Sequence, residues 1–232
     1  MWVVPSHGRP KLLKRLADSF GPKDLEQPVT VVLCDQDSAV PEYLQERWPA
    51  SWGFMIATGE NTYCGEKMNF ALEHLPHEKF YGHLCDDVWI QTKDMLVELS
   101  EAAEDWKISF PSDGIYDEQP PENLVCFPCM GGKLVRSIGW WAFPELKHNC
   151  IDSVITDIGV KLGLLVNMRH LRLSMLSPAD RVNFWDDTYK RVELINLEAG
   201  NIYHTSWEKV AREPTLVRIR AAMEADNGKR EG

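Results

Sequence analysis

The stretch KFYGHLCDDVW, residues 79–89, places two adjacent carboxylates, Asp86 and Asp87, at the end of an apolar, aromatic run. The run predicts a buried β-strand that ends on the acidic pair. Neighbouring carboxylates repel one another and resist burial, so a strand that ends on them needs a counter-charge. The alternative is that both side chains belong to an exposed turn. The position therefore raises the question of which cation the pair meets.

Strands and helices alternate around this stretch. Strands are predicted at residues 2–6, 29–35, 53–59 and 79–87, and amphipathic helices at residues 9–20 and 66–75. Near-continuous apolar strands separated by helices predict an α/β fold with a mostly parallel sheet that is covered on both faces. Ligands of such sheets bind beyond the carboxyl ends of the strands. The polar residues that follow the strands are therefore expected to converge on one crevice.

The second half of the chain has a similar pattern. A helix is predicted at residues 92–106 with Thr92 as its N-cap, and residues 113–123 form a Pro-rich, acidic loop before the strand-like residues 124–130. Two further helices are expected to stop at Gly139 and Gly163. A C-terminal helix is predicted from about residue 207 to residue 225, followed by a frayed end.

Composition limits the class of protein. The 232 residues, of which 44% are hydrophobic and 26% charged, suit one soluble globular domain. A net charge of −10 argues against a protein that coats nucleic acid through a general positive field. No apolar run is long enough for a membrane span, and the first residues do not resemble a signal peptide. We therefore expect a cytoplasmic protein with six reduced cysteines and no membrane partner.

Three polar clusters suggest a site for an anionic ligand and a metal. Paired carboxylates at a strand end are typical ligands of Mg²⁺ or Mn²⁺, which retain waters and substrate phosphates in their coordination shell. Arg9, after the first strand, suits a phosphate. Lys67 and Asn69 lie near a helix start, where backbone N–H groups also favour anions.

The order VVPSHGRP, VTVVLCDQD, CGEKMNFALEHL and FYGHLCDDV resembles the nucleotide-sugar half of GT-A glycosyltransferases, especially the family 2-like enzymes found in bacteriophages. The resemblance implies a GT-A, Rossmann-like fold, whose mostly parallel central sheet is flanked by helices, with a smaller acceptor-side subregion. It implies that Asp86 and Asp87 bind Mn²⁺ or Mg²⁺, with Asp86 also near the diphosphate of a UDP-sugar or related donor. For a phage-encoded protein it implies the host cytoplasm.

The same resemblance implies further donor contacts. Asp35 and Asp37 would contact the base and ribose. The other implied contacts lie along the nucleotide or near the diphosphate: Pro5, Ser6, Arg9, Lys67 and Asn69.

Residues 131–163 are similar to the acceptor-side segment of the family. Asp152 takes the place of the general base that deprotonates an acceptor hydroxyl in an inverting displacement. The alternative is that Asp152 only caps a helix. Trp140, Trp141 and His148 lie beside it as candidate acceptor contacts, whereas Asp157 is expected on another face of the helix. The segment FWDDTYKR, residues 184–191, also resembles the family.

The metal site departs from the family pattern in two ways. A full D-x-D spacing is absent, and Met175 and Ser177 occupy the place before Pro178 where relatives often carry histidine. The third metal ligand is therefore open. His170 and His204 are substitutes by proximity in sequence, although a lone histidine is more often structural.

Cys126 and Cys129 form a C-x-x-C that, with His148 and Cys150, is an alternative candidate for a structural zinc site. The compact second pair and the strand-like setting argue against it. A thioredoxin-like role is disfavoured because the cysteines do not open a helix.

The expected organisation is one GT-A domain with its donor half in residues 1–106 and its acceptor half in residues 107–205. Residues 206–232 would form a C-terminal helix and tail. The expected function is transfer of a sugar from a nucleoside diphosphate to a hydroxyl group. The basic residues within 133–147 and 209–220 make a hydroxymethylated base in DNA one candidate acceptor, and a glycan, lipid-linked sugar or protein hydroxyl is another. The rival interpretations are a catalytically degenerate binding or scaffold protein and a nucleotidyltransferase.

Overall fold

The computed structural model describes residues 1–59, 63–114, 124–175, 195 and 198–230. Its strands are β1 (Trp2–Pro5), β2 (Val29–Cys34), β3 (Trp52–Ala57), β4 (Phe80–His83), β5 (Val88–Ile90), β6 (Ile108–Ser112), β7 (Cys129–Gly131) and β8 (Leu165–Met175). Its helices are α1 (Pro10–Asp18), η1 (Asp24–Glu26), α2 (Val40–Gln45), α3 (Cys64–His74), α4 (Met95–Ala102), α5 (Gly132–Ile138), α6 (Ile151–Leu162), the π-helix η2 (Tyr203–Ala211) and α9 (Arg212–Arg230).

The eight strands form a sheet in the order β3-β2-β1-β4-β7-β6-β8-β5. The first four of these are parallel to one another, as the sequence predicts. Beyond β4 the sheet is mixed, because β7 runs antiparallel to both β4 and β6, and β5 runs antiparallel to β8. The expectation of a mostly parallel sheet is therefore correct for the donor half and wrong for the rest.

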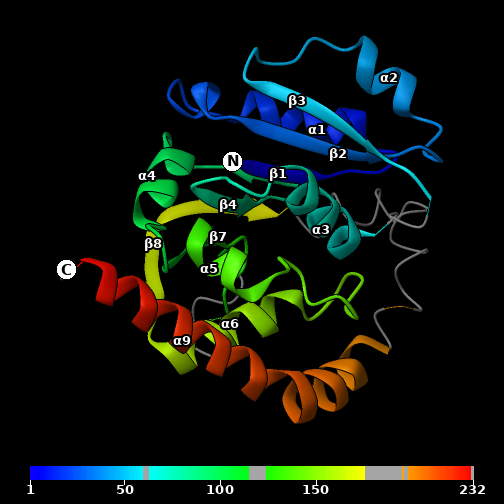
Figure 1. Ribbon diagram of the computed structural model, residues 1–232. Helices are drawn as coiled ribbons and strands as arrows, with labels where there is room; N and C mark the ends of the chain where they lie inside the picture. The colour runs from blue at the N-terminus through cyan, green and yellow to red at the C-terminus, as the bar shows by residue number, and fades with distance from the viewer. Residues whose placement is uncertain (60–62, 115–123, 176–194, 196–197, 231–232) are drawn as a thin grey trace.

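Helices cover both faces of the sheet, which confirms that expectation (Figure 1). Successive strand residues point to opposite faces: Val3 of β1 joins the core under α3, α5 and α6, whereas Trp2 and Val4 join the core under α1 and α4. The C-terminal helix α9 packs across α5 and α6, so residues from the end of the chain contribute to the first of these cores.

Several expected boundaries agree with the structure. The strands β1, β2 and β3 and the helices α1 and α3 lie within one or two residues of the predicted ranges. Gly139 and Gly163 end α5 and α6 in the left-handed region, with φ of 81° and 65°. Glycine adopts this conformation without a steric penalty.

Other boundaries differ. The fourth strand ends at His83, so the acidic pair lies in a turn between β4 and the short strand β5. The predicted helix from Thr92 starts only at Met95, because Asp94 has a left-handed backbone and the Thr92 hydroxyl instead accepts a hydrogen bond from the backbone N–H of Arg172. Strands β5, β6 and β8 are absent from the prediction, and the strand expected at residues 124–130 is confined to β7, which begins at Cys129.

The C-terminal end is ordered further than expected. Helix α9 continues to Arg230, beyond the predicted end at residue 225. Asp226 accepts hydrogen bonds from Lys133, at 3.0 Å, and from the Trp106 indole, at 3.2 Å. These long-range contacts hold the last turns against the domain, so the expectation of fraying is wrong for residues 226–230. None of the described helices combines the length and apolar character that a bilayer span needs.

The register of the two central strands depends on a glycine. Gly82 of β4 faces the Trp2 indole so closely that an added methyl group would overlap the ring. We predict that Gly82→Ala lowers the free energy of unfolding by about 1–3 kcal/mol through overpacking. Gly53→Ala is the matched control, because nothing lies within 4 Å of a methyl group there. Urea denaturation of both variants measures the difference, and equal stabilities would contradict the packing argument.

Candidate functional site

One edge of the sheet collects the polar residues that follow the strands. Strands β1, β2 and β4 are parallel, and β6 runs in the same direction because both it and β4 are antiparallel to β7. Their carboxyl ends therefore meet at the same edge. Ser6, Asp37, Asp86 and Asp113 follow these strands and are all buried at that edge.

Arg9 is the cation that meets the acidic pair. Its Nη1 lies 3.3 Å from Oδ1 of Asp86 and 3.6 Å from Oδ2 of Asp87. The three side chains are each less than 10% exposed. Burial raises the pKa of Asp86, Arg9 opposes this change, and the charge of Asp87 adds to it. The interpretation of Asp86 and Asp87 as exposed turn residues is therefore wrong, since they form a buried charge cluster of the kind found at functional sites.

A chain of hydroxyl groups holds Asp86. The backbone N–H of Arg9 donates to the Tyr43 hydroxyl oxygen at 2.7 Å, and Ser6 Oγ donates to Asp86 Oδ2 at 2.6 Å. The two hydroxyls lie 2.6 Å apart. Because the hydrogen of Ser6 is used on the carboxylate, Tyr43 must donate to Ser6. The chain thus has one direction and fixes Oδ2 of Asp86.

The remaining donor-side candidates divide into buried and exposed groups. Lys67 is 2% exposed and donates to the carbonyl oxygen of Ser6 at 2.5 Å. Asp37 is 4% exposed and accepts from the backbone N–H groups of Gly8 and Ala39. Asp35, after β2, is exposed, and Pro5 ends β1. Of the two carboxylates, Asp35 is exposed and could contact a ligand. Asp37 and Lys67 are buried, and their hydrogen bonds hold the backbone of the neighbouring loops.

Asn69 joins the two halves of the protein. Its side-chain amide donates to the carbonyl oxygen of Ala142 and accepts from the backbone N–H groups of Trp141 and Ala142, at 2.8–3.0 Å. Asn69 thus holds the turn that follows Gly139 and Trp140 against α3. Trp141 is fully buried and packs edge-on against Tyr81, so it is a core residue with no surface for stacking on an acceptor.

Asp152 lies in the first turn of α6 and is half-buried. Cys150 is the N-cap residue, so the interpretation of Asp152 as a helix cap is wrong. Burial and the nearby Asp113 carboxylate raise the pKa of Asp152 to about 7. A carboxylate with this pKa suits a general base at neutral pH.

Asp152 and the acidic pair act electrostatically on the same two cysteines, Cys64 and Cys85. Burial, followed by the charge of Asp152, raises the pKa of Cys64 to about 12, and Asp86 and Asp87 contribute in the same direction. Cys85 is affected by the same three carboxylates. Asp152 and the acidic pair therefore lie within electrostatic range of the same thiols. Next to Cys64, His83 Nε2 is 3.5 Å from its sulfur, and burial with His148 lowers the pKa of His83 to about 4.

The candidate histidine ligands lie in other settings. His170 is paired with Glu98 at 3.5 Å and His204 with Glu208 at 2.6 Å, and both side chains are about two-thirds exposed. Across the described ranges, no group of three or more His, Cys, Asp or Glu side chains is arranged to hold a metal ion. Asp86 and Asp87, together with substrate phosphates, suit Mg²⁺ or Mn²⁺, which are commonly held by one or two carboxylates and phosphate oxygens. Pro178, Ser177 and residues 184–191 lie outside the described residues.

The acceptor side contains an aromatic cluster. Trp140 is half-buried and contacts Phe143 and Trp207 edge-on, at centroid distances of 5.6 and 6.0 Å. The Trp207 indole donates to Asp157 Oδ2 at 3.0 Å, so Asp157 anchors the π-helix η2. His148 is half-buried in the loop before α6.

The basic segments proposed for nucleic acid have internal partners. Lys133 lies 3.0 Å from carboxylate oxygens of both Asp105 and Asp226. Arg136 donates to the carbonyl oxygen of Glu78 and Arg218 to that of Ile138. These cations stabilise the domain, which weakens the interpretation of the segments as a DNA groove. None of the six cysteines forms a disulfide, in agreement with the expected thiols.

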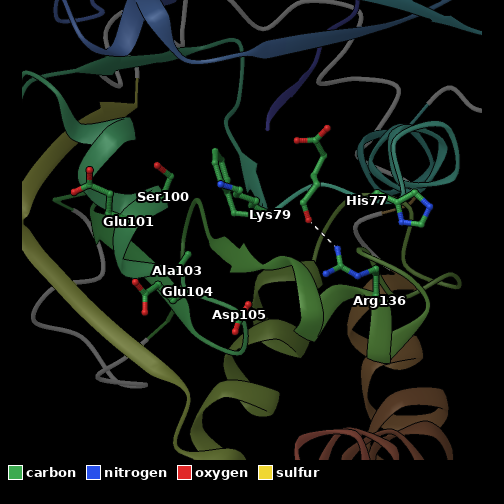
Figure 2. Close-up of a pocket in the computed structure, with 10 residues that line it drawn as sticks. His77, Lys79, Ser100, Glu101, Ala103, Glu104, Asp105 and Arg136 are labelled. Carbon is green, nitrogen blue, oxygen red and sulfur yellow. Dashed lines mark hydrogen bonds between the residues drawn. The ribbon is translucent and has the colours of Figure 1, made fainter. Parts of the chain in front are cut away.

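A pocket of about 680 Å³ lies elsewhere, between the amino end of β4 and the C-terminal end of α4 (Figure 2). It is lined by charged side chains of both signs, including Lys79, Glu101, Glu104 and Arg136. It shares no residue with the acidic cluster and lies at the opposite edge of the sheet. The pocket therefore has no part in the chemistry of Asp86 and Asp152.

Two site residues are absent from the sequence-based list. Asp113 follows β6 as Asp35 follows β2, so the signal existed, but residues 108–112 were not recognised as a strand. Tyr43 is a lone aromatic on the short helix α2, which gives no pattern that indicates its buried hydroxyl chain.

Solved structures with a similar fold include two that were determined with a nucleotide or nucleotide sugar and Mn²⁺. The mannosyltransferase PcManGT from Pyrobaculum calidifontis, solved with GDP-Man and Mn²⁺, has a TM-score of 0.58 at 14% identity over 98% of this chain and 74% of its own. S. aureus TarS has a TM-score of 0.53 at 15% identity over 94% of this chain. The protein spans only 42% of the length of that TarS chain.

A third similar structure is the glucosyl-3-phosphoglycerate synthase from Mycobacterium tuberculosis, in complex with Mn²⁺, UDP and glucosyl-3-phosphoglycerate. It has a TM-score of 0.52 at 12% identity over 78% of this chain and 74% of its own. At these identities the likeness shows the fold alone, and it confirms a GT-A type of α/β fold with a mixed sheet. No protein-family model and no curated protein sequence matches the chain.

The hydroxyl chain gives a prediction. Tyr43→Phe removes the hydroxyl that bonds both Ser6 and Arg9, and we expect a loss of about 1–2 kcal/mol in the free energy of unfolding. Tyr81→Phe is the matched control, because Tyr81 is equally buried and its hydroxyl donates to Leu75 outside the site.

Each variant is then combined with Asp86→Asn in a double-mutant cycle measured by urea unfolding. Tyr43 should couple to Asp86 by roughly 0.5 kcal/mol or more, and Tyr81 should be additive. Additivity for Tyr43 would show that the chain does not act on Asp86.

Proposed function

We propose that the protein is a metal-dependent glycosyltransferase that moves a sugar from a nucleoside diphosphate to a hydroxyl acceptor. The observation that supports the proposal is the buried pair Asp86 and Asp87 at the carboxyl ends of the strands in a GT-A type of sheet. Asp152, whose pKa is raised to about 7, acts on the same buried thiols as this pair.

The donor would bind at the carboxyl ends of β1, β2 and β4. The exposed carboxylate of Asp35 would accept a hydrogen bond from the base or ribose, and Arg9 would bind the diphosphate because its planar fork matches phosphate oxygens. Lys67 and Asn69 act indirectly in this proposal, since Lys67 holds the Ser6 loop and Asn69 holds the acceptor-side turn. UDP and GDP are the donor nucleotides to test first.

Asp86 and Asp87 would hold Mn²⁺ or Mg²⁺ together with the donor phosphates. Such an ion, when bound, supplies positive charge that makes the diphosphate a better leaving group. His170 and His204 are not part of this proposal, because each is exposed and paired with a glutamate.

Asp152 would act as the general base. Its carboxylate takes the proton of the acceptor hydroxyl while the oxygen forms a bond to the anomeric carbon. The bond from that carbon to the diphosphate breaks, and the diphosphate leaves with the electron pair. A direct displacement of this kind inverts the anomeric centre. Trp140, which follows α5, and His148, in the loop before α6, are the proposed acceptor contacts.

Nucleotide binding tests the proposal against its rivals. UDP or GDP with Mn²⁺, at about a hundred times Kd, should raise the melting temperature by roughly 5–10 °C. Little change is expected with either nucleotide when the metal is chelated. No response to any nucleotide would favour a scaffold, and a preference for triphosphates would favour a nucleotidyltransferase. Transfer assays with glycans and with hydroxymethylated DNA then separate the acceptor classes.

Asp152→Asn should lower the transfer rate on the order of 10²–10⁴-fold while donor binding stays close to that of the wild type. The base must be ionised, so kcat/KM of the wild type should rise with pH up to a plateau above about pH 7. Asp113→Asn removes a charge that raises this pKa, so its profile should move to lower pH. Transfer by Asp152→Asn at the wild-type rate would remove Asp152 from the role.

The same pKa predicts an effect on stability. The folded protein holds the Asp152 proton more tightly than the unfolded chain, so this residue makes the fold less stable as the pH rises from about 4 to 7. Asp152→Asn should therefore stabilise the fold at pH 8, on the order of 1 kcal/mol, with no gain at pH 4. Urea unfolding at both pH values measures this difference. An equal effect at the two pH values would contradict the raised pKa.

A further inference from the structure

Arg9 has two properties that bear on how the acidic pair takes a metal ion. Its guanidinium group contacts both carboxylates, at 3.3 Å from Asp86 and 3.6 Å from Asp87, and the side chain is 8% exposed. The cluster thus holds two negative charges and one positive charge away from water. A divalent ion bound to both carboxylates would lie beside the guanidinium, where burial leaves the repulsion between like charges poorly screened.

A nucleoside diphosphate changes this balance. Its phosphate oxygens add negative charge that attracts both a divalent ion and the guanidinium group. The planar fork of arginine matches phosphate as well as it matches carboxylate. With a nucleotide bound, Arg9 would have a second anionic partner, and the acidic pair would have room for the ion.

The surroundings allow this exchange without rebuilding the site. The Tyr43 hydroxyl oxygen accepts a hydrogen bond from the backbone N–H of Arg9, so the Arg9 backbone would stay in place while its side chain turns. Ser6 holds Oδ2 of Asp86, and Arg9 contacts Oδ1. The carboxylate that Arg9 would leave thus keeps its orientation through a separate hydrogen bond.

We propose that Arg9 is a resident counter-cation that keeps the acidic pair from binding a divalent ion alone, so that metal and nucleotide bind together. The proposal deepens the proposed function and rests on it for the identity of the nucleotide. The expected effect of Arg9 on Mn²⁺ binding in the absence of nucleotide does not depend on catalysis. By linkage, the nucleotide should raise metal affinity by the same factor as the metal raises nucleotide affinity.

Mn²⁺ titration followed by electron paramagnetic resonance tests the proposal on the wild type and on Arg9→Gln, with and without UDP or GDP. Without nucleotide, Arg9→Gln should bind Mn²⁺ at least tenfold more tightly than the wild type. With nucleotide, affinity should rise more than tenfold in the wild type and by a smaller factor in the variant. Lys14→Gln is the control, because it removes the same charge from a half-buried position on α1, where Lys14 pairs with Asp18 and not with the acidic pair, and it should bind Mn²⁺ like the wild type.

Equal or weaker binding of Mn²⁺ alone by Arg9→Gln would overturn the proposal. If that variant does not fold, the wild type still decides the matter, since micromolar affinity for Mn²⁺ without nucleotide would overturn it and weak affinity would support it. The proposed function fails separately, when UDP and GDP have no effect on the wild type in the presence of Mn²⁺. The comparison of Mn²⁺ alone between Arg9→Gln and wild type remains decisive in that case.

Discussion

The buried contact of Arg9 with Asp86 and Asp87 is the constraint on which the rest of the site depends. Each of these charges would be costly to bury alone, and each is tolerated because the others are present. The contact joins the loop after β1 to the turn after β4, 77 residues apart in the chain. It forms only because β1 and β4 are neighbouring parallel strands with Trp2 opposite Gly82. The packing of an indole on a glycine in the sheet thus sets the position of the charges at its edge.

The donor half of the fold was predictable because its local signals agree with one another. The strand at residues 29–34 is apolar and buried almost throughout, and α1 has its apolar residues on one face. The long strand β8 lacks such a signal. Its residues LVNMRHLRLSM are mostly half-buried or exposed, and its pairing with β6 contains an irregularity. Apolar and polar residues alternate only over its last five residues, 171–175, and no continuous apolar run appears. The last turns of α9 depend on the contacts of Asp226 with Trp106 and Lys133. These are tertiary contacts, which a local sequence pattern does not show.

The sequence predicted which strand ends carry the site, but not how the side chains pair. Ser6, Arg9, Asp86 and Asp87 were expected at one edge because parallel strands share their carboxyl ends. That Arg9 supplies the counter-charge could not be deduced, since contact between residues so far apart requires the strand order. Asn69 and Trp141 illustrate the opposite difficulty. Their places in the sequence suit ligand contacts, yet one ties two segments together and the other fills the core.

The position of β5 determines when the acidic turn becomes fixed during folding. The turn lies between β4 and β5, and β5 pairs in the sheet with the end of β8, Val88 opposite Met175. A growing chain can form the β1–β4 pair once β4, which ends at His83, has emerged, but β8, the strand partner of β5, is made much later. Long-range pairing of this kind is slow because a large loop must close first. The carboxylates are thus synthesised early and held from both sides only late, so a nascent or truncated chain that ends before β8 would carry an acidic turn without its second support.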